Sequence, residues 1–559
     1  MSLFDDLAPD ASRRSRVGVI THGSLGAGVE MKLDPARSVE SVRAGTFVVV
    51  EGEAFDFFSL ITDVRIDAAN EGILLNPPGR EDELLRRVLQ GSGTYATVSM
   101  KPQLMVPQGT LDEAPQPVKT VPAHFSAVGE ATADDVARVF GAEANAGGDR
   151  FFNVGTPLGM DTPVCLDLAR FVERSNAVFG KTGTGKSFLT RLLLAGTIAT
   201  GRATNLIFDM HNEYGFKARQ ESDDETASFV PGLQQLFGSR VQIFSLDPES
   251  TRRRGGSPDA EVHLYADQVE PEDVLPLRDT LQLNATATES TFALKKAYGA
   301  RWLARLLEAE PGEVEEMATA TGAHPGSLSA LKRKLDRLTS YAFFHTEPRQ
   351  GKRDAIDELF DALDAGRSVV LEFGRYNSLL AYLLVANVVT RRLRDIYERK
   401  METYERTQNT ADQPRQLLIT IEEAHKFLGP ETARETPFGT IAREMRKFYV
   451  SLLIVDQRPS GIDEEVLSQI GTKMVAQLND EKDIAAALVG SPGAAALRQI
   501  LASLDSKQQA LLLGHAVPMP ITIRTRDYGP ELFADVRARA GLSTAATPEA
   551  RRAETASLF

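Results

Sequence analysis

Short apolar runs alternate with amphipathic segments along the chain from about residue 150. Segments 187–199 and 379–394 carry apolar residues at helical spacing. Buried strands that alternate with helices are typical of a mainly parallel sheet covered on both faces. The pattern therefore predicts an α/β domain, with strands at Asn176–Phe179, Asn205–Phe208, Val241–Phe244, Val369–Phe373, Leu417–Ile421, Leu452–Val455, Met474–Leu478, Ala510–Leu513 and Ile521–Ile523.

The N-terminal part has a different pattern, with short β-rich runs between glycine-containing or polar turns. The runs are Arg16–Thr21, Val29–Leu33, Thr46–Glu51 and Phe57–Val64. Regularly spaced short strands of this kind predict a small barrel or sandwich. The proline-rich segment 102–122 that follows reads as a linker or as a strand pair leading out of the barrel.

One long stretch, residues 264–366, interrupts the alternation because nearly all of it has a helical pattern. We interpret it as a helical insertion in the α/β domain. The last residues, 543–559, are small and polar and read as a frayed tail. The predicted divisions are an N-terminal extension (1–15), a small β-barrel (16–125), a first part of the α/β core (126–263), the helical insertion (264–366), a second part of the core (367–542) and the tail (543–559).

Composition narrows the class of protein. The chain has 559 residues, 42% of them hydrophobic, so it can bury a core; its formal net charge is −14. The single cysteine, Cys165, excludes an internal disulfide framework and a multi-cysteine zinc site. No secretory signal and no run long enough to cross a bilayer is present, so we expect a cytoplasmic protein without a membrane partner. The acidic average still permits nucleic-acid binding through a locally basic channel.

The strongest chemical signal is Gly180-Lys-Thr-Gly-Thr-Gly-Lys-Ser187, which fits the phosphate-binding loop pattern G-x-x-x-x-G-K-[ST] between a strand and a helix. Glycines let backbone N–H groups approach phosphates, and the helix N-terminus favours negative charge. Lys186 would reach the β- and γ-phosphates, and the Ser187 hydroxyl would bind Mg²⁺. The sequence thus predicts ATP and Mg²⁺ as cofactors, with nucleotide contacts from Gly180, Thr182, Gly183, Thr184, Gly185, Lys186, Ser187 and Phe188.

Two further predicted strands end in polar residues that suit nucleotide hydrolysis. The strand at 417–421 runs into Glu422 and Glu423; we assign Glu422 to the metal ion, directly or through water, and Glu423 to the attacking water. The strand at 452–455 is followed by Gln457, a candidate to sense the γ-phosphate or orient water. An acidic helix start and a simple turn are the alternative interpretations of these two segments.

Other charged residues have weaker support. Arg443 or Arg446 could reach a neighbouring subunit's site and stabilise charge on the γ-phosphate; a solvated helix face is the alternative interpretation. Asp209 and Glu213 follow another strand and are possible accessory residues, and a plain loop explains this segment equally well. The histidines lie at no metal-ligand spacing, so we expect them to be structural.

Taken together, KTGTGKS, DMHNEY, IEEAHKF, IAREMRK and LLIVDQRPSGID resemble the HerA branch of the FtsK–HerA ATPases. The N-terminal strands resemble the β-barrel that opens HerA proteins, and 504–526 resembles their closing segment. The resemblance covers most of residues 16–527. It implies a RecA-like P-loop ATPase core with a mainly parallel sheet.

The resemblance also implies a function. Members of this family are homohexameric ring ATPases that translocate double-stranded DNA, commonly with a NurA-like nuclease in DNA end processing, and some bacterial members work with other effectors in phage defence. It implies a catalytic role for Glu423, a sensor role for Gln457 and a trans-acting arginine among Arg443 and Arg446. The chain departs from the family pattern by carrying Glu422 where aspartate is usual, and by lacking a glycine before the second arginine of REMRK.

Within that hypothesis, Lys217 and Arg219 are candidates to line a DNA channel. Two other functions stay open at this point. The chain could be a hexameric scaffold that uses nucleotide as a switch for an effector enzyme, or a secretion- or conjugation-type motor ATPase.

Overall fold

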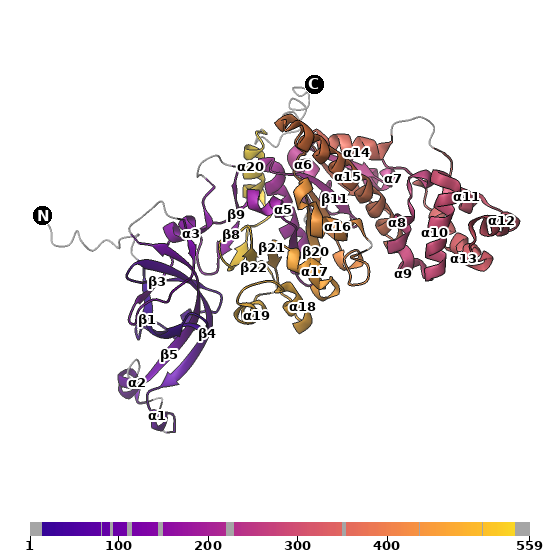
Figure 1. Ribbon diagram of the computed structural model, residues 1–559. Coiled ribbons are helices and arrows are strands. Elements are labelled where there is room, and N and C mark those ends of the chain that lie inside the picture. The colour runs from indigo at the N-terminus through magenta and orange to yellow at the C-terminus, as the bar shows by residue number, and fades with distance from the viewer. Residues whose placement is uncertain are drawn as a thin grey trace. The chain divides into compact units, whose positions relative to one another are not determined.

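A computed structural model describes residues 14–75, 77–79, 81–89, 93–108, 114–143, 149–219, 229–348, 354–434, 436–505 and 507–542. The chain divides into two compact units (Figure 1). One unit contains Met1–Asp167 and Thr472–Asp527, and the other contains Leu168–Gly471 and Tyr528–Phe559. Residues 472–527, which the sequence pattern grouped with the second part of the core, therefore lie in the same unit as the N-terminal region.

Six antiparallel strands close into a barrel in the first unit. Their order is β2-β1-β7-β3-β4-β5, and β2 pairs with β5 to complete the ring, while β6 extends the edge of β5. Alternate residues, among them Met31, Val48 and Val98, fill its core, as the two-residue period of a strand requires. The predicted small β-barrel is confirmed. Its strands are β1 (Arg16–Ser24), β2 (Gly28–Leu33), β3 (Phe47–Glu51), β4 (Phe55–Ala68), β5 (Thr94–Pro107), β6 (Gln116–Pro117) and β7 (Ala127–Glu130), with α1 (Glu71–Leu75) and α2 (Glu83–Leu89) between β4 and β5.

The proline-rich segment is part of this barrel at its start. Residues 102–107 belong to the long strand β5, so only the later part of 102–122 leaves the barrel. Pro102 lies opposite Ser59, where the register between β4 and β5 shifts. A bulge of this kind tolerates proline because the ladder is already interrupted there. Strand β7 begins just after residue 125, where the sequence pattern ended the barrel, and pairs with both β1 and β3.

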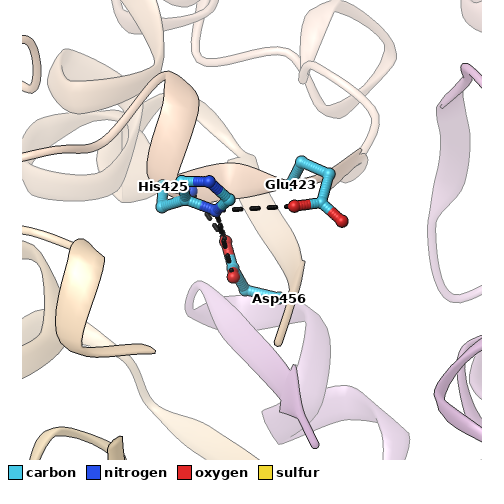
Figure 2. Close-up of side chains that lie close together, drawn as sticks. All are labelled: Glu423, His425 and Asp456. Carbon is cyan, nitrogen blue, oxygen red and sulfur yellow. Dashed lines mark hydrogen bonds and ion pairs between the residues drawn. The ribbon is translucent and has the colours of Figure 1, made fainter. Parts of the chain in front are cut away.

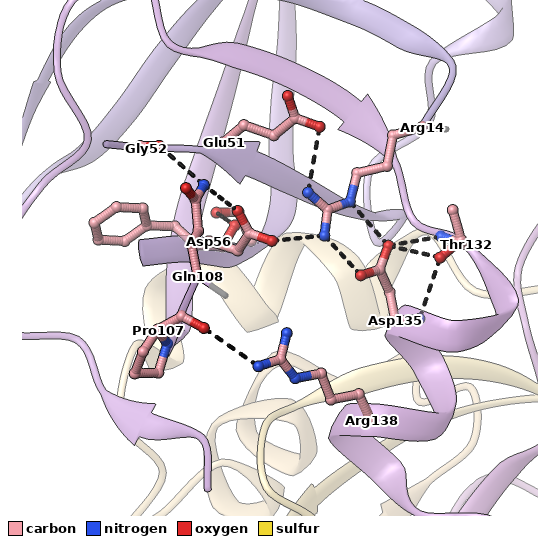
Figure 3. Close-up of polar contacts among 11 residues, drawn as sticks. Arg14, Glu51, Gly52, Asp56, Pro107, Gln108, Thr132, Asp135 and Arg138 are labelled. Atoms are coloured by element: carbon pink, nitrogen blue, oxygen red, sulfur yellow. Dashed lines mark hydrogen bonds and ion pairs between the residues drawn. The ribbon is translucent and has the colours of Figure 1, made fainter. Parts of the chain in front are cut away.

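Helix α3 (Ala133–Phe140) is attached to the barrel through a partly buried arginine, Arg14 (Figure 3). The guanidinium of Arg14 donates to Asp56 at 2.7 Å and to Asp135 at 2.8 and 3.0 Å. Asp135 also accepts from the backbone and hydroxyl of Thr132, which caps the helix. Burial alone would raise the pKa of Asp135, but these hydrogen bonds lower it. The ion pair therefore ties the start of the described chain to the helix that leaves the barrel.

The rest of the first unit is an antiparallel sheet in the order β21-β22-β23-β8-β9. The Thr522 hydroxyl donates to the carbonyl of Gly45, which connects this sheet to the barrel. The elements are β8 (Phe151–Pro157), β9 (Val164–Asp167), β21 (Thr472–Val475), α18 (Glu481–Ala487), α19 (Ala494–Ala502), β22 (Gln509–Gly514) and β23 (Ile521–Thr525).

The second unit is built on a parallel sheet in the order β15-β14-β18-β11-β19-β20-β10. Its central strands are buried on both faces, which explains why they read as continuous apolar runs. The strands are β10 (Asn176–Phe179), β11 (Thr204–Asp209), β14 (Val241–Ser245), β15 (Ala260–Glu261), β18 (Ser368–Glu372), β19 (Leu417–Glu422) and β20 (Val450–Asp456). Because all are parallel, their carboxyl ends meet at one edge, where polar residues from distant segments are brought together.

Helices cover this sheet in the second unit (Figure 1). Helix α5 follows β10 directly, and α15 is 29 residues long, so it extends well past the predicted end at residue 394. None of the helices in the described ranges combines the length and apolarity needed to cross a membrane. The helices outside the insertion are α4 (Leu168–Glu173), α5 (Lys186–Thr200), α6 (Leu233–Phe237), α7 (Pro248–Arg253), α15 (Leu379–Thr407), α16 (Pro437–Glu444), α17 (Glu464–Gln469) and α20 (Pro530–Arg539), and a small hairpin is formed by β12 (Lys217–Arg219) and β13 (Phe229–Pro231).

The predicted helical insertion is present between β15 and β18. Four of its helices pack together around Trp302, which is buried and donates from Nε1 to the Val269 carbonyl at 2.9 Å. Two short strands, β16 (Leu264–Tyr265) and β17 (Phe344–His345), pair near the two ends of the insertion. The helices are α8 (Pro271–Val274), α9 (Arg278–Leu281), α10 (Ala285–Tyr298), α11 (Trp302–Glu308), α12 (Pro311–Thr321), α13 (Pro325–Leu335) and α14 (Ala355–Asp364).

Candidate nucleotide site

The loop between β10 and α5 has the backbone that phosphate binding requires. Gly183 and Gly185 have φ angles of +80° and +85°, a region that favours glycine. Gly185 caps α5 without a side chain, so the first N–H groups of the helix have no side-chain acceptor from their own cap. The carbonyl of Lys181 accepts from the Thr184 hydroxyl at 2.8 Å and from Lys186 Nζ at 3.0 Å. These two hydrogen bonds bend the loop around the Lys181 carbonyl and hold the Lys186 ammonium next to that carbonyl.

The ends of β19 and β20 bring the predicted polar residues next to this loop. The Thr182 hydroxyl donates to Gln457 Oε1 at 2.8 Å, although the two residues are 275 positions apart. Gln457 Nε2 in turn donates to Glu423 at 3.3 Å. Glu423 has a φ of +49°, so its backbone turns away from the strand. The phosphate loop, the amide and the carboxylate therefore form one connected hydrogen-bonded chain.

These groups line a single pocket with a volume of about 260 Å³. It contains most of the predicted nucleotide contacts, both predicted glutamates and the predicted amide. It is lined by Thr182, Gly183, Gly185, Lys186, Ser187, Phe188, Arg191, His211, Glu213, Glu422, Glu423, Val455, Asp456 and Gln457. Of the predicted contacts, Gly180 and Thr184 are not among the lining residues; Gly180 donates from its backbone N–H to the Asp456 carbonyl at 3.3 Å, and the Thr184 hydroxyl is turned to Lys181.

Glu422 lies at the buried floor of this pocket. Its Oε1 accepts from the Tyr214 hydroxyl at 2.8 Å, whereas Oε2 is buried with no hydrogen-bond partner in the described part of the chain. Burial, and then the charge of Glu213, raise the pKa of Glu422 to about 7. An unpaired carboxylate oxygen in a pocket that Ser187 also lines suits a hydrated divalent cation. These residues therefore fit the predicted Mg²⁺ role.

His425 and Asp456 contact the segment that carries Glu423 (Figure 2). His425 Nδ1 lies 3.0 Å from Asp456 Oδ2 and 3.6 Å from Glu423 Oε2. The buried carboxylate of Asp456 also accepts backbone N–H groups of His425 and Arg458, each at 2.7 Å. Ligand atoms of the three side chains lie within 4.8 Å of one another, a spacing compatible with a metal ion. Because Asp456 already accepts hydrogen bonds from two backbone segments, we interpret these contacts as structural. They orient the Glu423 side chain.

The two predicted accessory residues have different positions. Glu213 lines the pocket, but Asp209 is fully buried behind it, where its carboxylate accepts the backbone N–H groups of Glu213 and Tyr214, each at 2.8 Å. Burial, and then the charges of Glu372 and Glu422, raise the pKa of Asp209 to about 7. Asp209 therefore shapes the turn that carries Glu213 and does not face the pocket.

Sequence reasoning missed Arg191, the buried cation of the site. Its side chain is 1% exposed and packs against the rings of Phe188, Tyr214 and Tyr528, with its guanidinium carbon 4.9, 5.7 and 6.0 Å from the ring centres. Nη2 lies 3.7 Å from Glu213, whereas Nε and Nη1 find no acceptor among the described residues. The available signal was a single arginine in an otherwise apolar helix segment directly after the phosphate loop.

Three of the remaining predicted residues, Arg443, Arg446 and Lys217, do not line the pocket. Arg443 is partly buried and donates to the Ala433 carbonyl at 3.3 Å, and Arg446 is exposed; neither lines the pocket within the described chain. Lys217 is exposed on β12. The side chain of Arg219 lies outside the described residues.

The geometry suits phosphoanhydride hydrolysis. Lys186 and the start of α5 supply positive charge, and Glu423, held by Gln457 and His425, is a carboxylate that can orient a water molecule and accept its proton.

Comparisons with known proteins agree with this assignment. The family described as the helicase HerA central domain matches residues 152–393. The chain is 25% identical over 394 residues to the DNA double-strand break repair helicase HerA of Pyrococcus furiosus. The aligned region covers 67% of this chain and 68% of that protein. It is 24% identical over 511 residues to the enzyme of the same description from Sulfolobus acidocaldarius, covering 88% and 90%.

Two solved structures have a partial likeness to the chain. VirB4 of Thermoanaerobacter pseudethanolicus has a TM-score of 0.41 and 15% identity, over 68% of this chain and 97% of that chain. The bacterial conjugative coupling protein TrwB has a TM-score of 0.42 and 13% identity, over 67% and 88%.

Proposed function

We propose that the chain is a HerA-type ATPase of the FtsK–HerA superfamily that hydrolyses ATP, and that it is an ATP-driven translocase of double-stranded DNA. It acts as a homohexameric ring with a nuclease or another effector subunit, in DNA end processing or in phage defence. The relatives described as DNA double-strand break repair helicases support the nucleic-acid substrate.

The observation that carries the proposal is the connection from Thr182 through Gln457 to Glu423. Thr182 belongs to the phosphate loop, so a phosphate bound there competes for the same amide that positions Glu423. Loss of the terminal phosphate would return the amide to its contacts with Thr182 and Glu423. A residue that senses the phosphate and holds the catalytic carboxylate suits a motor, because hydrolysis must change the conformation of the protein.

Each group in the pocket has a defined task. Lys186 and the N–H groups of α5 bind the phosphates, and Glu423 orients the attacking water and receives its proton. Ser187 and Glu422 hold Mg²⁺, which when bound neutralises charge on the phosphate oxygens. Arg443 or Arg446 of one subunit reaches the pocket of the next, where a guanidinium stabilises charge on the γ-phosphate.

ATP turnover measured with and without duplex DNA tests the proposal. We expect duplex DNA to stimulate turnover, and Lys186→Ala to abolish it. Nucleotide binding with turnover that ignores duplex DNA would overturn the translocase and favour a nucleotide-switched scaffold.

A further inference from the structure

Four exposed basic side chains lie along one part of the carboxyl edge of the parallel sheet, on a chain whose formal net charge is −14. We call them the basic band; its members are Lys217, Arg252, Arg253 and Arg375. They come from β12, from the last turn of α7 and from the segment after β18. The packing of these elements shows that they form one surface.

Helix α7 connects the two ends of the band. At its start, the Asp247 carboxylate caps the helix by accepting the Ser250 N–H at 3.2 Å, and it also accepts the Arg375 N–H at 3.2 Å. At its end, Gly255 and Gly256 pack so closely on Phe216 that a Cβ on either would lie 3.4 Å from it. Phe216 in turn carries Lys217, whose ammonium is 5.4 Å from the ring centre.

The charges of the band are only partly compensated. Arg375 lies 3.5 Å from Asp247 and over the ring of Tyr376, and Glu249 is an exposed carboxylate at the start of α7. Arg252 and Arg253 are exposed, and their guanidinium groups have no ion-pair or hydrogen-bond partner in the described ranges. By contrast, the neighbouring Arg254 is bound to the buried Glu372. Unpaired arginines beside cations stacked on aromatic rings suit a phosphate backbone.

The band is also connected to the nucleotide pocket through Asn212. This residue lies between His211 and Glu213, which both line the pocket. Its side-chain amide accepts the Gly374 N–H at 2.9 Å and donates to the Gly374 carbonyl at 3.2 Å. Gly374 directly precedes Arg375. These two hydrogen bonds therefore link the pocket wall around Glu213 to the segment that anchors α7.

We propose that the basic band binds the phosphate backbone of duplex DNA, and that the paired hydrogen bonds between Asn212 and Gly374 couple this contact to the nucleotide pocket. The inference rests on the proposed translocase function and assigns its DNA contact and its regulation to particular residues. Nucleotide and DNA then change each other's affinity by the same factor, as reciprocal coupling requires.

The DNA contact is tested with Arg252→Gln/Arg253→Gln in the full chain, by titrating labelled duplex DNA at several salt concentrations. Each protomer that engages DNA through both arginines contributes two phosphate contacts, so we expect the slope of log affinity against log salt to become shallower by at least about 1.8 and the affinity to fall at least about tenfold. Arg333→Gln/Arg337→Gln removes the same charge from exposed positions of the helical insertion and is the matched control. Thermal melting verifies that both variants fold.

Unchanged affinity for duplex DNA and an unchanged salt slope in the Arg252/Arg253 variant would refute the assignment of the DNA contact to the basic band. The proposed translocase function would not be affected by that result. A poly-glutamate chain that displaces duplex DNA from the unmodified protein at equal charge concentration would assign the band to acidic protein instead. Failure of the unmodified protein to bind duplex DNA would overturn both proposals.

The coupling is tested with Asn212→Gly, which removes the amide but tolerates the φ of +57° at this position. Duplex affinity is measured with and without a non-hydrolysable ATP analogue, and analogue affinity with and without duplex. We expect a coupling factor of about 5–150 in the unmodified protein and a factor near one in the variant. Gln408→Gly, at another residue of positive φ, is the control for backbone effects. Coupling that persists in Asn212→Gly would refute the connection.

Discussion

Arg191 allows a sharp test of whether a buried residue serves stability or activity. Its guanidinium is 1% exposed, and two of its nitrogens lack an acceptor among the described residues. Burying such a group costs folding free energy. We consider Arg191→Met, which keeps the unbranched stem and removes the charge. If the arginine is present because of its charge next to the pocket, the variant loses activity without losing stability.

The expected change in stability is small. Replacing a buried charged group by an apolar one of similar volume is neutral or stabilising by about 1–4 kcal/mol. Loss of the contacts with the rings of Phe188, Tyr214 and Tyr528 opposes this by about 0.5–2 kcal/mol for each ring. The pair with Glu213 adds little, because that side chain is 41% exposed. The three rings together account for about 1.5–6 kcal/mol, so the middles of the two ranges leave a net loss of about 1 kcal/mol. This is less than the loss of about 2–5 kcal/mol typical of truncating a large core side chain.

The expected change in activity comes from Glu422. Burial and the charge of Glu213 raise its pKa to about 7, and the charge of Arg191 opposes this rise. Without that charge the pKa rises further, by about one unit or less, so the ionised fraction at pH 7 falls from about one half to as little as about one tenth. Turnover at pH 7 should therefore fall up to about fivefold and recover as the pH is raised.

The assay is the pH profile of ATP turnover, measured beside urea denaturation of the same preparations. Arg191→Lys retains the charge and should keep the acid limb of the profile near its original position. An acid limb that does not move in Arg191→Met would refute the electrostatic role. A loss of several kcal/mol in both variants would instead identify Arg191 as a packing element.

Three further predictions concern the same pocket. Glu423→Gln should keep nucleotide bound but slow single-turnover hydrolysis at least about 10²-fold, because the base for water is lost; unchanged turnover would contradict the assignment. Subunits that carry Glu423→Gln can be mixed with subunits that carry Arg443→Ala or Arg446→Ala. ATP turnover should recover in the mixture whose arginine variant removes the residue that acts between subunits, and no recovery in either mixture would exclude both arginines from that role. Because folding raises the pKa of Glu422 from 4.5 to about 7, its contribution is present below pH 4.5 and is lost as the pH rises through 7. Glu422 should therefore lower the free energy of unfolding without nucleotide by about 3 kcal/mol across that interval. Glu422→Gln should make the dependence measured by urea denaturation shallower and leave the part due to Asp209, whose pKa is also raised to about 7; an equal slope in the variant would place the titration elsewhere.

The fold was predictable where one physical pattern dominates. Strands buried on both faces read as apolar runs, and every predicted strand of the second unit lies in its sheet within a few residues. The sequence pattern did not predict strand direction in 472–527. Six residues separate β22 from β23, which is too short for a crossover and therefore forces an antiparallel pair. That spacing was a usable signal, whereas the prolines in β5 concealed a barrel strand.

The sequence predicts the individual motifs of the site but not the contacts between them. Local motifs identify Lys186, Glu423 and Gln457, since each follows an apolar strand. Their contact depends on the lateral order β19-β20-β10, which differs from the order along the chain. No local pattern specifies that order, so the hydrogen bond from Thr182 to Gln457 appears only in three dimensions.

The same lateral order explains why buried acids accumulate at this edge. Asp209 pairs in register with Glu372 on β18, and Glu422 ends β19 on the other side of β11. Asp456 ends β20 on the far side of β19, so four carboxylates lie at adjacent strand ends and repel one another unless neighbouring groups compensate them. Arg191 compensates Glu422 at the pocket, and Arg254 of α7 is bound to Glu372 at the other end of the row. A change of charge in the pocket alters the balance at Glu422 first, and the row then extends the effect toward α7. Carboxylates with perturbed pKa values cluster at functional sites, and these lie at the edge of the sheet that carries the nucleotide pocket.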